Sequence, residues 1–241
     1  MMLFLCGKGP AFQSIVLDLI KDNHKIAVFS HDGDPTVGMC RSLGIPVTTE
    51  SVNDMSIWPW KPAAIASVGY LDIIRAHVLE AMDNRVFNCH YALLPAHRGR
   101  SSVPWAIIDG DTVTGITYHW IEQGIDTGRI LLQASCRITA EDTQATLFAK
   151  LHGLAHAYFM AALRLAMIDT FGVPQQHEGA SYHKAGPPHN GVINPKWDNS
   201  YIERFIRAMT YPPLPYATYR GEEVKTFAEF RRMTQQYEVL A

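Results

Sequence analysis

Three polar residues in the middle of the chain have the types and spacing needed for acyl transfer to an amine. Asn88 and His90 lie in a stretch with the composition of a strand, and Cys89 stands between them. Side chains alternate between the two faces of a strand, so the amide and the imidazole share one face while Cys89 points into packing. Asp126 follows in a turn with glycines on both sides. An imidazole can take a proton, an amide can stabilise an oxyanion, and a carboxylate can orient the imidazole.

The elements around these residues predict an open, doubly wound, mostly parallel α/β sheet of the Rossmann-like type. Short apolar runs alternate with helical patterns, which is typical of parallel βαβ units. The expected strands are 3–6, 25–30, 63–70 and 85–90, and the expected helices between them are 12–20, 36–44 and 73–82. Ligands bind beyond the carboxyl ends of the strands in such sheets, and Asn88 and His90 lie at one of these ends. An Asn-x-His pair is more commonly a satisfied pair in a core, but this position favours a site.

The second half of the chain predicts fewer and longer elements. Strands are expected at 112–122 and 129–138, a long helix at 143–168, a further helix at 199–209, and a hairpin at 216–227 with its turn at 220–221. The stretch 179–195 is rich in Gly, Pro and Asn and predicts a loop. We divide the chain into a catalytic domain, 1–190, and a carboxyl-terminal extension with a small helix and a β-hairpin, 191–241.

Composition excludes several classes of protein. The chain has 241 residues and a formal net charge of −2, which argues against a general nucleic-acid binder. The start lacks the basic segment of a secretory signal, and the most apolar stretch, 154–171, is interrupted by His156, Arg164 and Asp169, so we expect a core helix, no membrane partner and a cytoplasmic location. Four widely spaced cysteines without a CxxC pair predict reduced thiols, with neither a disulfide framework nor a metal site.

Other candidate motifs have simpler interpretations. Lys8 lies between two glycines after the first strand, but the GxGxxG fingerprint of dinucleotide binding is absent, so the alternative is a contact with a substrate phosphate. His152 and His156 are four residues apart on a helix, yet no HExxH motif is formed, and a packing or surface role is expected. His119 stands on an aromatic strand where it can orient the turn that carries Asp126.

The stretch 87–131 resembles the signature of the folate-dependent formyltransferases. That family includes methionyl-tRNA formyltransferase, glycinamide ribonucleotide formyltransferase and the nucleotide-sugar N-formyltransferases. The matching positions are Asn88, His90, Leu94-Pro95, Arg98-Gly99, Trp105-Ala106, Gly110, Thr114-Gly115, His119 and Asp126-Thr127-Gly128. Weaker similarity covers most of the first 170 residues and the segment 204–215.

The resemblance implies a formyl donor, N10-formyltetrahydrofolate, no metal, and a catalytic trio of Asn88, His90 and Asp126. It also implies a folate pocket formed by the loop after the strand at 63–70, the turn before Arg98, and the stretch before Asp126. Carried over to this sequence, the pocket residues are Asp72, Ile73, Ile74, Arg100, Glu122, Gln123, Gly124 and Ile125.

The acceptor amine is inferred from further resemblance. The tRNA enzymes continue into a larger basic domain, and the glycinamide ribonucleotide enzymes carry a Gly/Ser/Asn-rich phosphate loop where this chain has "GKGPAF". The short nucleotide-sugar enzymes remain, which act on substrates such as dTDP-4-amino-4,6-dideoxyglucose for the O-antigen of lipopolysaccharide and are often homodimers. Substrate contacts are expected at Lys8, Arg98, Tyr211 and Tyr219. The alternatives are another amine (a UDP-amino sugar, glycinamide ribonucleotide or methionyl-tRNA) or an inactive regulator that binds folate or a nucleotide.

Overall fold

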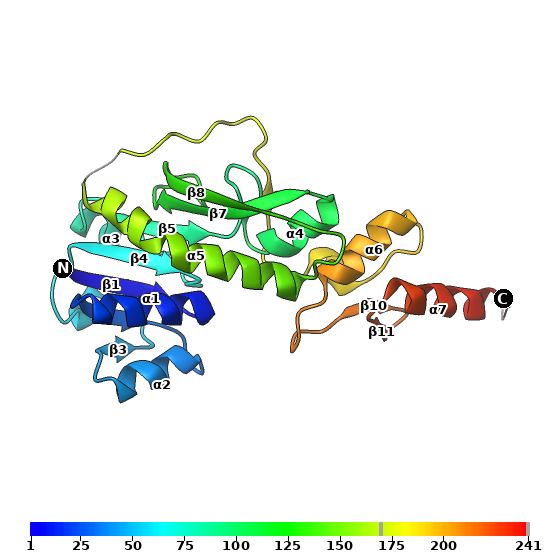
Figure 1. Cartoon of the computed structure of the whole chain (residues 1–241), viewed down its shortest axis with the longest axis horizontal. Coiled ribbons are helices and arrows are strands. Elements are labelled where there is room, and N and C mark those ends of the chain that lie inside the picture. The colour runs from blue at the N-terminus through cyan, green and yellow to red at the C-terminus, as the bar shows by residue number, and fades with distance from the viewer. Residues whose placement is uncertain (169–170, 240–241) are drawn as a thin grey trace.

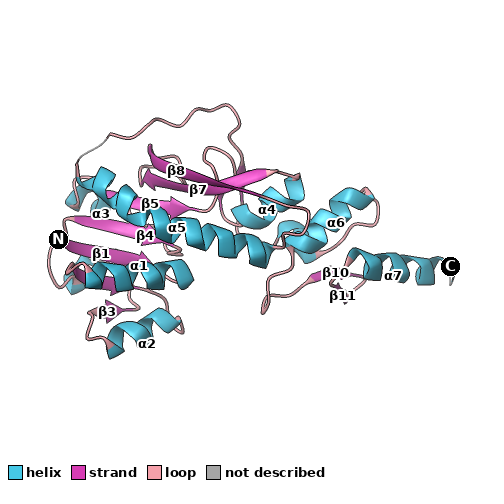
Figure 2. Cartoon of the chain, in the orientation of Figure 1, coloured by secondary structure: helices cyan, strands magenta, loops and turns pink. Residues whose placement is uncertain are grey.

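The computed structural model describes residues 1–168 and 171–239, and within them seven strands form one sheet with helices on both faces (Figures 1 and 2). The strands of this sheet are β1 (Met2–Gly7), β2 (Lys25–Phe29), β3 (Val47–Thr48), β4 (Ala64–Val68), β5 (Val86–His90), β7 (Val113–Trp120) and β8 (Ile130–Arg137). Their order is β3-β2-β1-β4-β5-β7-β8, and β7 and β8 are antiparallel to their neighbours while the others are parallel. The predicted doubly wound α/β fold is confirmed.

The helices and the smaller elements connect and cover this sheet. The helices are α1 (Pro10–Lys21), α2 (Pro35–Ser42), α3 (Ala76–Ala81), α4 (Ser102–Asp109), α5 (Gln144–Met167), α6 (Asn199–Ala208) and α7 (Phe227–Val239), with short 3₁₀ turns at Met55–Ile57 and Pro188–Gly191. Two small sheets pair β6 (Arg98–Gly99) with β9 (Tyr182–His183), and β10 (Ala217–Tyr219) with β11 (Glu222–Val224).

The strand β1 lies inside the sheet and is buried on both faces, which is why its sequence is continuously apolar. Leu3 and Leu5 belong to the larger apolar cluster together with residues of α1 and α5, whereas Phe4 and Cys6 belong to a second cluster with residues of α3. Figure 1 shows α1 and α5 lying side by side across one face of the sheet. The period-two alternation of β1 therefore divides its side chains between two cores.

The long helix α5 begins where its sequence supplies a cap. Thr143 accepts a hydrogen bond from the Thr146 amide, and the Thr146 hydroxyl accepts one from the Thr143 amide, which satisfies two amides at the start of the helix. Buried residues recur along one face from Leu147 to Ala166. Within the described residues, no helix is long and apolar enough to cross a membrane.

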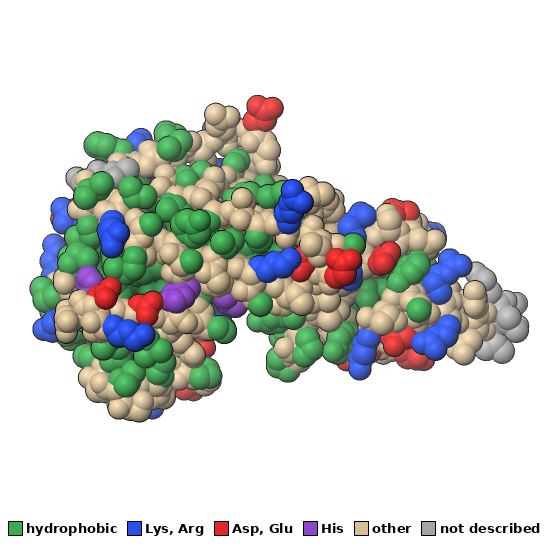
Figure 3. Space-filling model, viewed as in Figure 1, with side chains coloured by type: hydrophobic (Ala, Val, Ile, Leu, Met, Phe, Trp, Pro, Cys, Tyr) green, Lys and Arg blue, Asp and Glu red, His purple; other side chains and the backbone are tan. Residues whose placement is uncertain are grey.

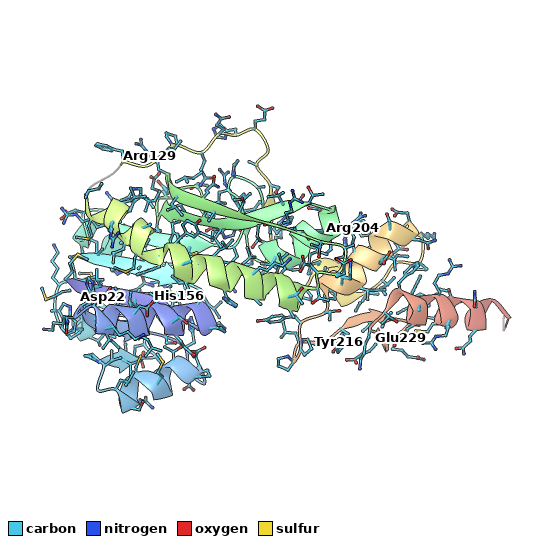
Figure 4. All side chains as sticks on the ribbon, viewed as in Figure 1. Asp22, Arg129, His156, Arg204, Tyr216 and Glu229 are labelled. Atoms are coloured by element: carbon cyan, nitrogen blue, oxygen red, sulfur yellow. The ribbon has the colours of Figure 1, made fainter. Side chains whose placement is uncertain are left out.

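The carboxyl-terminal segment docks through α6 and then extends away from the body (Figure 1). Arg204 of α6, labelled in Figure 4, donates from Nε to the Ile108 carbonyl of α4 at 2.8 Å. The hairpin turn has positive φ at Arg220 (52°) and Gly221 (86°), as a two-residue type I′ turn requires. Figure 3 shows basic and acidic side chains interspersed over this segment. The division into two domains at residue 190 stays a prediction.

Candidate active site

The site lies where β5 ends between β4 and β7. The register places Ser67 of β4 beside Asn88, and places His119 of β7 on its other side. Cys89, which faces away from this row, is buried in the larger apolar cluster, and burial raises the pKa of its thiol to about 12. The strand alternation predicted from the sequence therefore separates the polar pair from Cys89.

The amide of Asn88 is held in one orientation by its two strand neighbours. The Ser67 hydroxyl donates to Asn88 Oδ1 at 2.8 Å, and Asn88 Nδ2 lies 3.2 Å from His119 Nε2. His119 Nδ1 lies 2.8 Å from the Trp120 carbonyl, and His119 Nε2 also lies 3.5 Å from Asp126 Oδ1, so this ring connects the amide to the carboxylate. One N–H of the Asn88 amide is used in this network, and the second remains for a ligand in the adjoining cleft.

His90 is oriented so that one ring nitrogen is available to accept a proton. The residue is only 7% exposed, and its Nε2 donates to the His97 carbonyl at 2.8 Å. The other nitrogen, Nδ1, lies 3.5 Å from Asp126 Oδ2. Burial lowers the pKa of His90 and outweighs the opposing charge of Asp126. At neutral pH the ring is therefore neutral, with its lone pair on Nδ1.

Asp126 is held as an ionised carboxylate. It adopts a left-handed backbone conformation with φ of 54°, which is uncommon for a residue other than glycine. Burial raises the pKa of Asp126, but contacts with His119, the His90 ring and the Gly99 amide outweigh it and lower the pKa to about 2. The Gly99 amide donates to Oδ2 at 2.8 Å. The charge opposite His90 is therefore present at all physiological pH values.

Only glycine fits at position 99, whose backbone amide donates to Asp126. Its φ is 86°, and a Cβ atom there would lie 2.2 Å from the His183 carbonyl oxygen. Arg98, the preceding residue, donates to Gln175 Oε1 at 2.6 Å, and the Gln175 amide donates to the Asp126 carbonyl at 2.9 Å. The segment before α4 and the segment before β9 together support the turn that carries the carboxylate.

The trio opens into a cleft of about 820 Å³. All eight residues that the sequence predicts for a folate pocket line this cleft: Asp72, Ile73, Ile74, Arg100, Glu122, Gln123, Gly124 and Ile125. Arg100 donates from Nη2 to the Leu71 carbonyl at 2.7 Å and so connects two walls of the cleft. The geometry brings together one proton acceptor, one carboxylate and one amide donor at the side of a ligand-sized cleft.

Comparison with known proteins agrees with this geometry. Residues 47–163 match the model of a family described as formyl transferase. GDP-perosamine N-formyltransferases of Brucella melitensis biotype 1 and Brucella abortus are each 36% identical to this chain over 203 residues, which is 80% of this chain and 77% of theirs. The chain belongs to the formyltransferase family. It is an enzyme that transfers a one-carbon group to a nitrogen atom.

Solved structures share the fold of this formyltransferase. WlaRD, described as a sugar 3N-formyl transferase in the presence of dTDP and 5-N-formyl-THF, has a TM-score of 0.82 at 20% identity, over 94% of this chain and 85% of that one. An N-formyltransferase of Helicobacter canadensis in complex with folinic acid and dTDP-3-aminofucose has a TM-score of 0.80 at 21% identity, over 94% and 87%. These similarities extend through the carboxyl-terminal segment as well as the sheet.

The four residues expected to contact the substrate of the formyltransferase take different positions. Lys8 follows β1, and its carbonyl approaches Gly69, which lines the cleft. Tyr211 packs against Phe148, another lining residue, with 5.0 Å between ring centroids. None of the four residues is itself among those that line the cleft.

Arg98 and Tyr219 both make contacts with other side chains of the protein. Arg98 is bonded to Gln175 and supports the turn of Asp126, as described above. Tyr219 is 7% exposed and packs against Phe230 at 5.2 Å, because it lies on the buried side of the tail hairpin. Arg98 also lines a smaller pocket, which shares Ile125 and Tyr182 with the cleft. Contact of Arg98 or Tyr219 with the substrate stays a prediction.

Two residues that sequence reasoning missed lie at the site. Ser67 orients the Asn88 amide, and the signal for it is a lone hydroxyl near the end of the apolar run 63–70. Tyr91 lines the cleft, and its hydroxyl lies 2.9 Å from His152 Nδ1. His152 thus packs beside the cleft, while His156, labelled in Figure 4, lies 2.7 Å from Asp18 at the contact of α5 with α1.

Proposed function

We propose that this formyltransferase moves a formyl group from N10-formyltetrahydrofolate to the amine of a nucleotide-linked amino sugar, and that the sugar nucleotide is GDP-perosamine. The observation that carries the reaction type is the unprotonated Nδ1 of His90, placed between a buried carboxylate and an oriented amide at an open cleft. The two Brucella relatives support GDP-perosamine over the dTDP-4-amino-4,6-dideoxyhexose expected from the sequence.

The cleft fits a folate donor in size and chemistry. Its volume of about 820 Å³ is within the range of pockets that enclose drug-sized ligands. Ile73 is 70% exposed and Ile125 is 46% exposed, so both walls offer apolar surface to a flat ring. When bound, the donor supplies the formyl carbon as the electrophile.

His90 prepares the attacking nitrogen. An amino sugar is largely an ammonium ion at neutral pH and must lose a proton before its nitrogen can form a bond. Nδ1 of His90 accepts this proton, since Nε2 is already committed to the His97 carbonyl. The resulting imidazolium lies against the Asp126 carboxylate, 3.5 Å away, which stabilises its charge.

Asn88 stabilises the negative charge that develops during the attack. As the nitrogen forms its bond to the formyl carbon, negative charge develops on the formyl oxygen. When this charge collapses, the bond from the formyl carbon to the donor nitrogen would break, and the His90 imidazolium would return its proton to that leaving nitrogen. The free N–H of Asn88 is the donor for the formyl oxygen, and its direction is preset by Ser67 and His119. A donor that is oriented before the reaction has no reorganisation cost when the charge forms.

The sugar nucleotide is proposed to enter along the side of the cleft where Tyr211 packs against Phe148. Lys8 offers a cationic group for the diphosphate, and Tyr211 with Phe148 offers an aromatic surface for the base. This arrangement aligns the sugar amine with His90. Free GDP is then expected to compete with the sugar nucleotide, while the unlinked amino sugar binds weakly.

The test is an acceptor panel read by mass spectrometry. Purified protein is incubated with N10-formyltetrahydrofolate and, separately, GDP-perosamine, dTDP- and UDP-linked amino sugars, glycinamide ribonucleotide and methionyl-tRNA. We expect the mass of one added formyl group on GDP-perosamine, and none with the variant His90→Asn. Formylation of a dTDP or UDP sugar instead would overturn the base assignment, and formylation of glycinamide ribonucleotide or methionyl-tRNA alone would overturn the sugar.

A further inference from the structure

A second cluster of ligand-type side chains lies beside the active site, outside the residues that line the cleft. His97, Asp109 and His183 each offer one ligand atom, and these atoms all lie within 4.8 Å of one another. His97 Nδ1 is 2.8 Å from His183 Nε2 and 4.0 Å from Asp109 Oδ2. His97 is buried, His183 is half-buried and Asp109 is exposed, so the cluster reaches solvent on one side.

Three separate elements build this cluster. His97 directly precedes β6, Asp109 is the last residue of α4, and His183 is the last residue of β9. The parallel pairing of β6 with β9 brings the two histidines together, and the Trp105 ring stacks on His183 at 4.7 Å. Since these residues are far apart in the chain, they form no spacing motif, and the sequence alone predicts no metal site.

An additional carboxylate sets the protonation of His97. Asp111 Oδ2 lies 2.8 Å from His97 Nε2, so this nitrogen carries the proton and donates it to the carboxylate. The lone pair of His97 is therefore on Nδ1, which accepts a hydrogen bond from His183 Nε2 at 2.8 Å and faces Asp109. A bound ion would replace this hydrogen bond, and the His183 proton would move to its Nδ1. Histidines that bind metal ions characteristically donate their other N–H to a carboxylate in this way.

We propose that His97, Asp109 and His183 bind one divalent transition-metal ion, for which Zn²⁺ is the best fit. Two imidazole nitrogens and one carboxylate oxygen form a recognised three-ligand set for Zn²⁺, with water in the fourth position. Mg²⁺ and Ca²⁺ prefer sets composed of oxygen ligands. Metal–nitrogen bonds of about 2.0–2.1 Å in a tetrahedral site place ligand atoms about 3.3 Å apart, which small rotations of these side chains would achieve.

Such an ion would take no part in the reaction. It would affect the active site only by holding nearby backbone in place. The carbonyl of His97 accepts the Nε2 proton of His90, and Gly99, two residues later, donates to Asp126. An ion that ties His97 to His183 would hold the segment 97–99 against β9. The proposal does not depend on which amine is formylated.

The test measures metal binding by the whole protein without an affinity tag. After dialysis against EDTA, titration calorimetry with ZnCl₂ is expected to give one site per chain, and Co²⁺ is expected to give the strong visible absorption of a tetrahedral N/O site. His183→Ala should abolish both signals. Asp111→Asn, which removes only the orienting carboxylate, should weaken binding by about 10–100-fold.

A matched control and a second variant keep the test decisive. His156→Ala removes another histidine that contacts a carboxylate, Asp18 on α1, and should bind Zn²⁺ like the unaltered protein. If circular dichroism shows that His183→Ala does not fold, Asp109→Asn takes its place. The proposal is overturned if the unaltered protein binds no stoichiometric Zn²⁺, or if the folded ligand variant binds it equally well.

Discussion

Replacing Asp126 with asparagine isolates the effect of its charge on His90. The side chains are 14% and 8% exposed, and Asp126 Oδ2 lies 3.5 Å from His90 Nδ1. With an effective dielectric constant of about 20, a unit charge pair at this distance is worth about 5 kcal/mol. If this energy stabilises the imidazolium formed when the amine loses its proton, its loss lowers kcat by roughly 10³–10⁴-fold. The similar size of asparagine retains an oxygen that accepts the Gly99 amide.

The pH profile separates this effect from a general disturbance. Burial lowers the pKa of His90, and the charge of Asp126 opposes that shift. The acid limb of kcat/KM in the unaltered enzyme should therefore lie below the ordinary pKa of histidine, about 6.5, because activity is lost when a proton occupies Nδ1. Asp126→Asn removes the opposing charge, so its acid limb should move to lower pH while its plateau falls.

The assay is steady-state formylation of the accepted sugar nucleotide across pH 4.5–8.5, roughly the range that histidine chemistry spans. Asp18→Asn is the matched control, because it also removes a carboxylate beside a histidine, 2.7 Å from His156, far along α1 from the cleft. It should leave kcat and the acid limb unchanged. An Asp126→Asn enzyme within tenfold of the unaltered rate, with its acid limb in place, would refute the proposed coupling.

The same contacts determine the effects of other substitutions. Asn88→Ala should lower kcat and kcat/KM together by roughly 10²–10³-fold, and a change in KM alone would show that the amide serves ground-state binding. Ser67→Ala frees the Asn88 amide to rotate and, at about 1 kcal/mol for one neutral hydrogen bond, should lower kcat roughly fivefold in the same assay. Gly99→Ala brings a Cβ atom to 2.2 Å from the His183 carbonyl at a φ of 86°, and denaturant titration should show a loss of at least about 1–3 kcal/mol of stability. The pKa of Asp126, about 2, lies below the value of about 3.8 in the unfolded chain, so the ionised carboxylate stabilises the fold above pH 3.8. In the same denaturant titration, Asp126→Asn should have a free energy of unfolding lower by about 2 kcal/mol at pH 7, and this difference should shrink as pH falls toward 2.

Much of the fold is local in origin and was predictable. The strands β1, β2 and β4 are mostly apolar runs, β5 alternates apolar and polar residues, α5 carries its own cap at Thr143, and the turn at Arg220-Gly221 is a short-range hairpin signal. The elements missed are those with weak local signals. α4 contains Pro104, β3 and β6 have two residues each, and α7 is largely polar. The strand β6, for example, forms by pairing with β9, a segment distant in the chain.

For the site, the sequence by itself determined which chemical groups are present and predicted that Asn88, His90 and the turn of Asp126 belong to one site, and the structure places all three at one cleft. Strand alternation and the position of ligand sites in parallel sheets are general properties, so they can be applied without coordinates. The eight residues expected at the folate pocket likewise all line one cleft.

Only the tertiary structure decided how these groups are protonated and oriented. The lone pair of His90 lies on Nδ1 because the carbonyl of His97 occupies Nε2, and the Asn88 amide faces one way because Ser67 and His119 stand on neighbouring strands. A tautomer depends on the single hydrogen-bond partner that another segment brings within about 3 Å, and side-chain spacing along a chain carries no information about that partner. The same holds for His97 and His183. They are far apart in the sequence, and only the pairing of β6 with β9 brings their ring nitrogens to 2.8 Å.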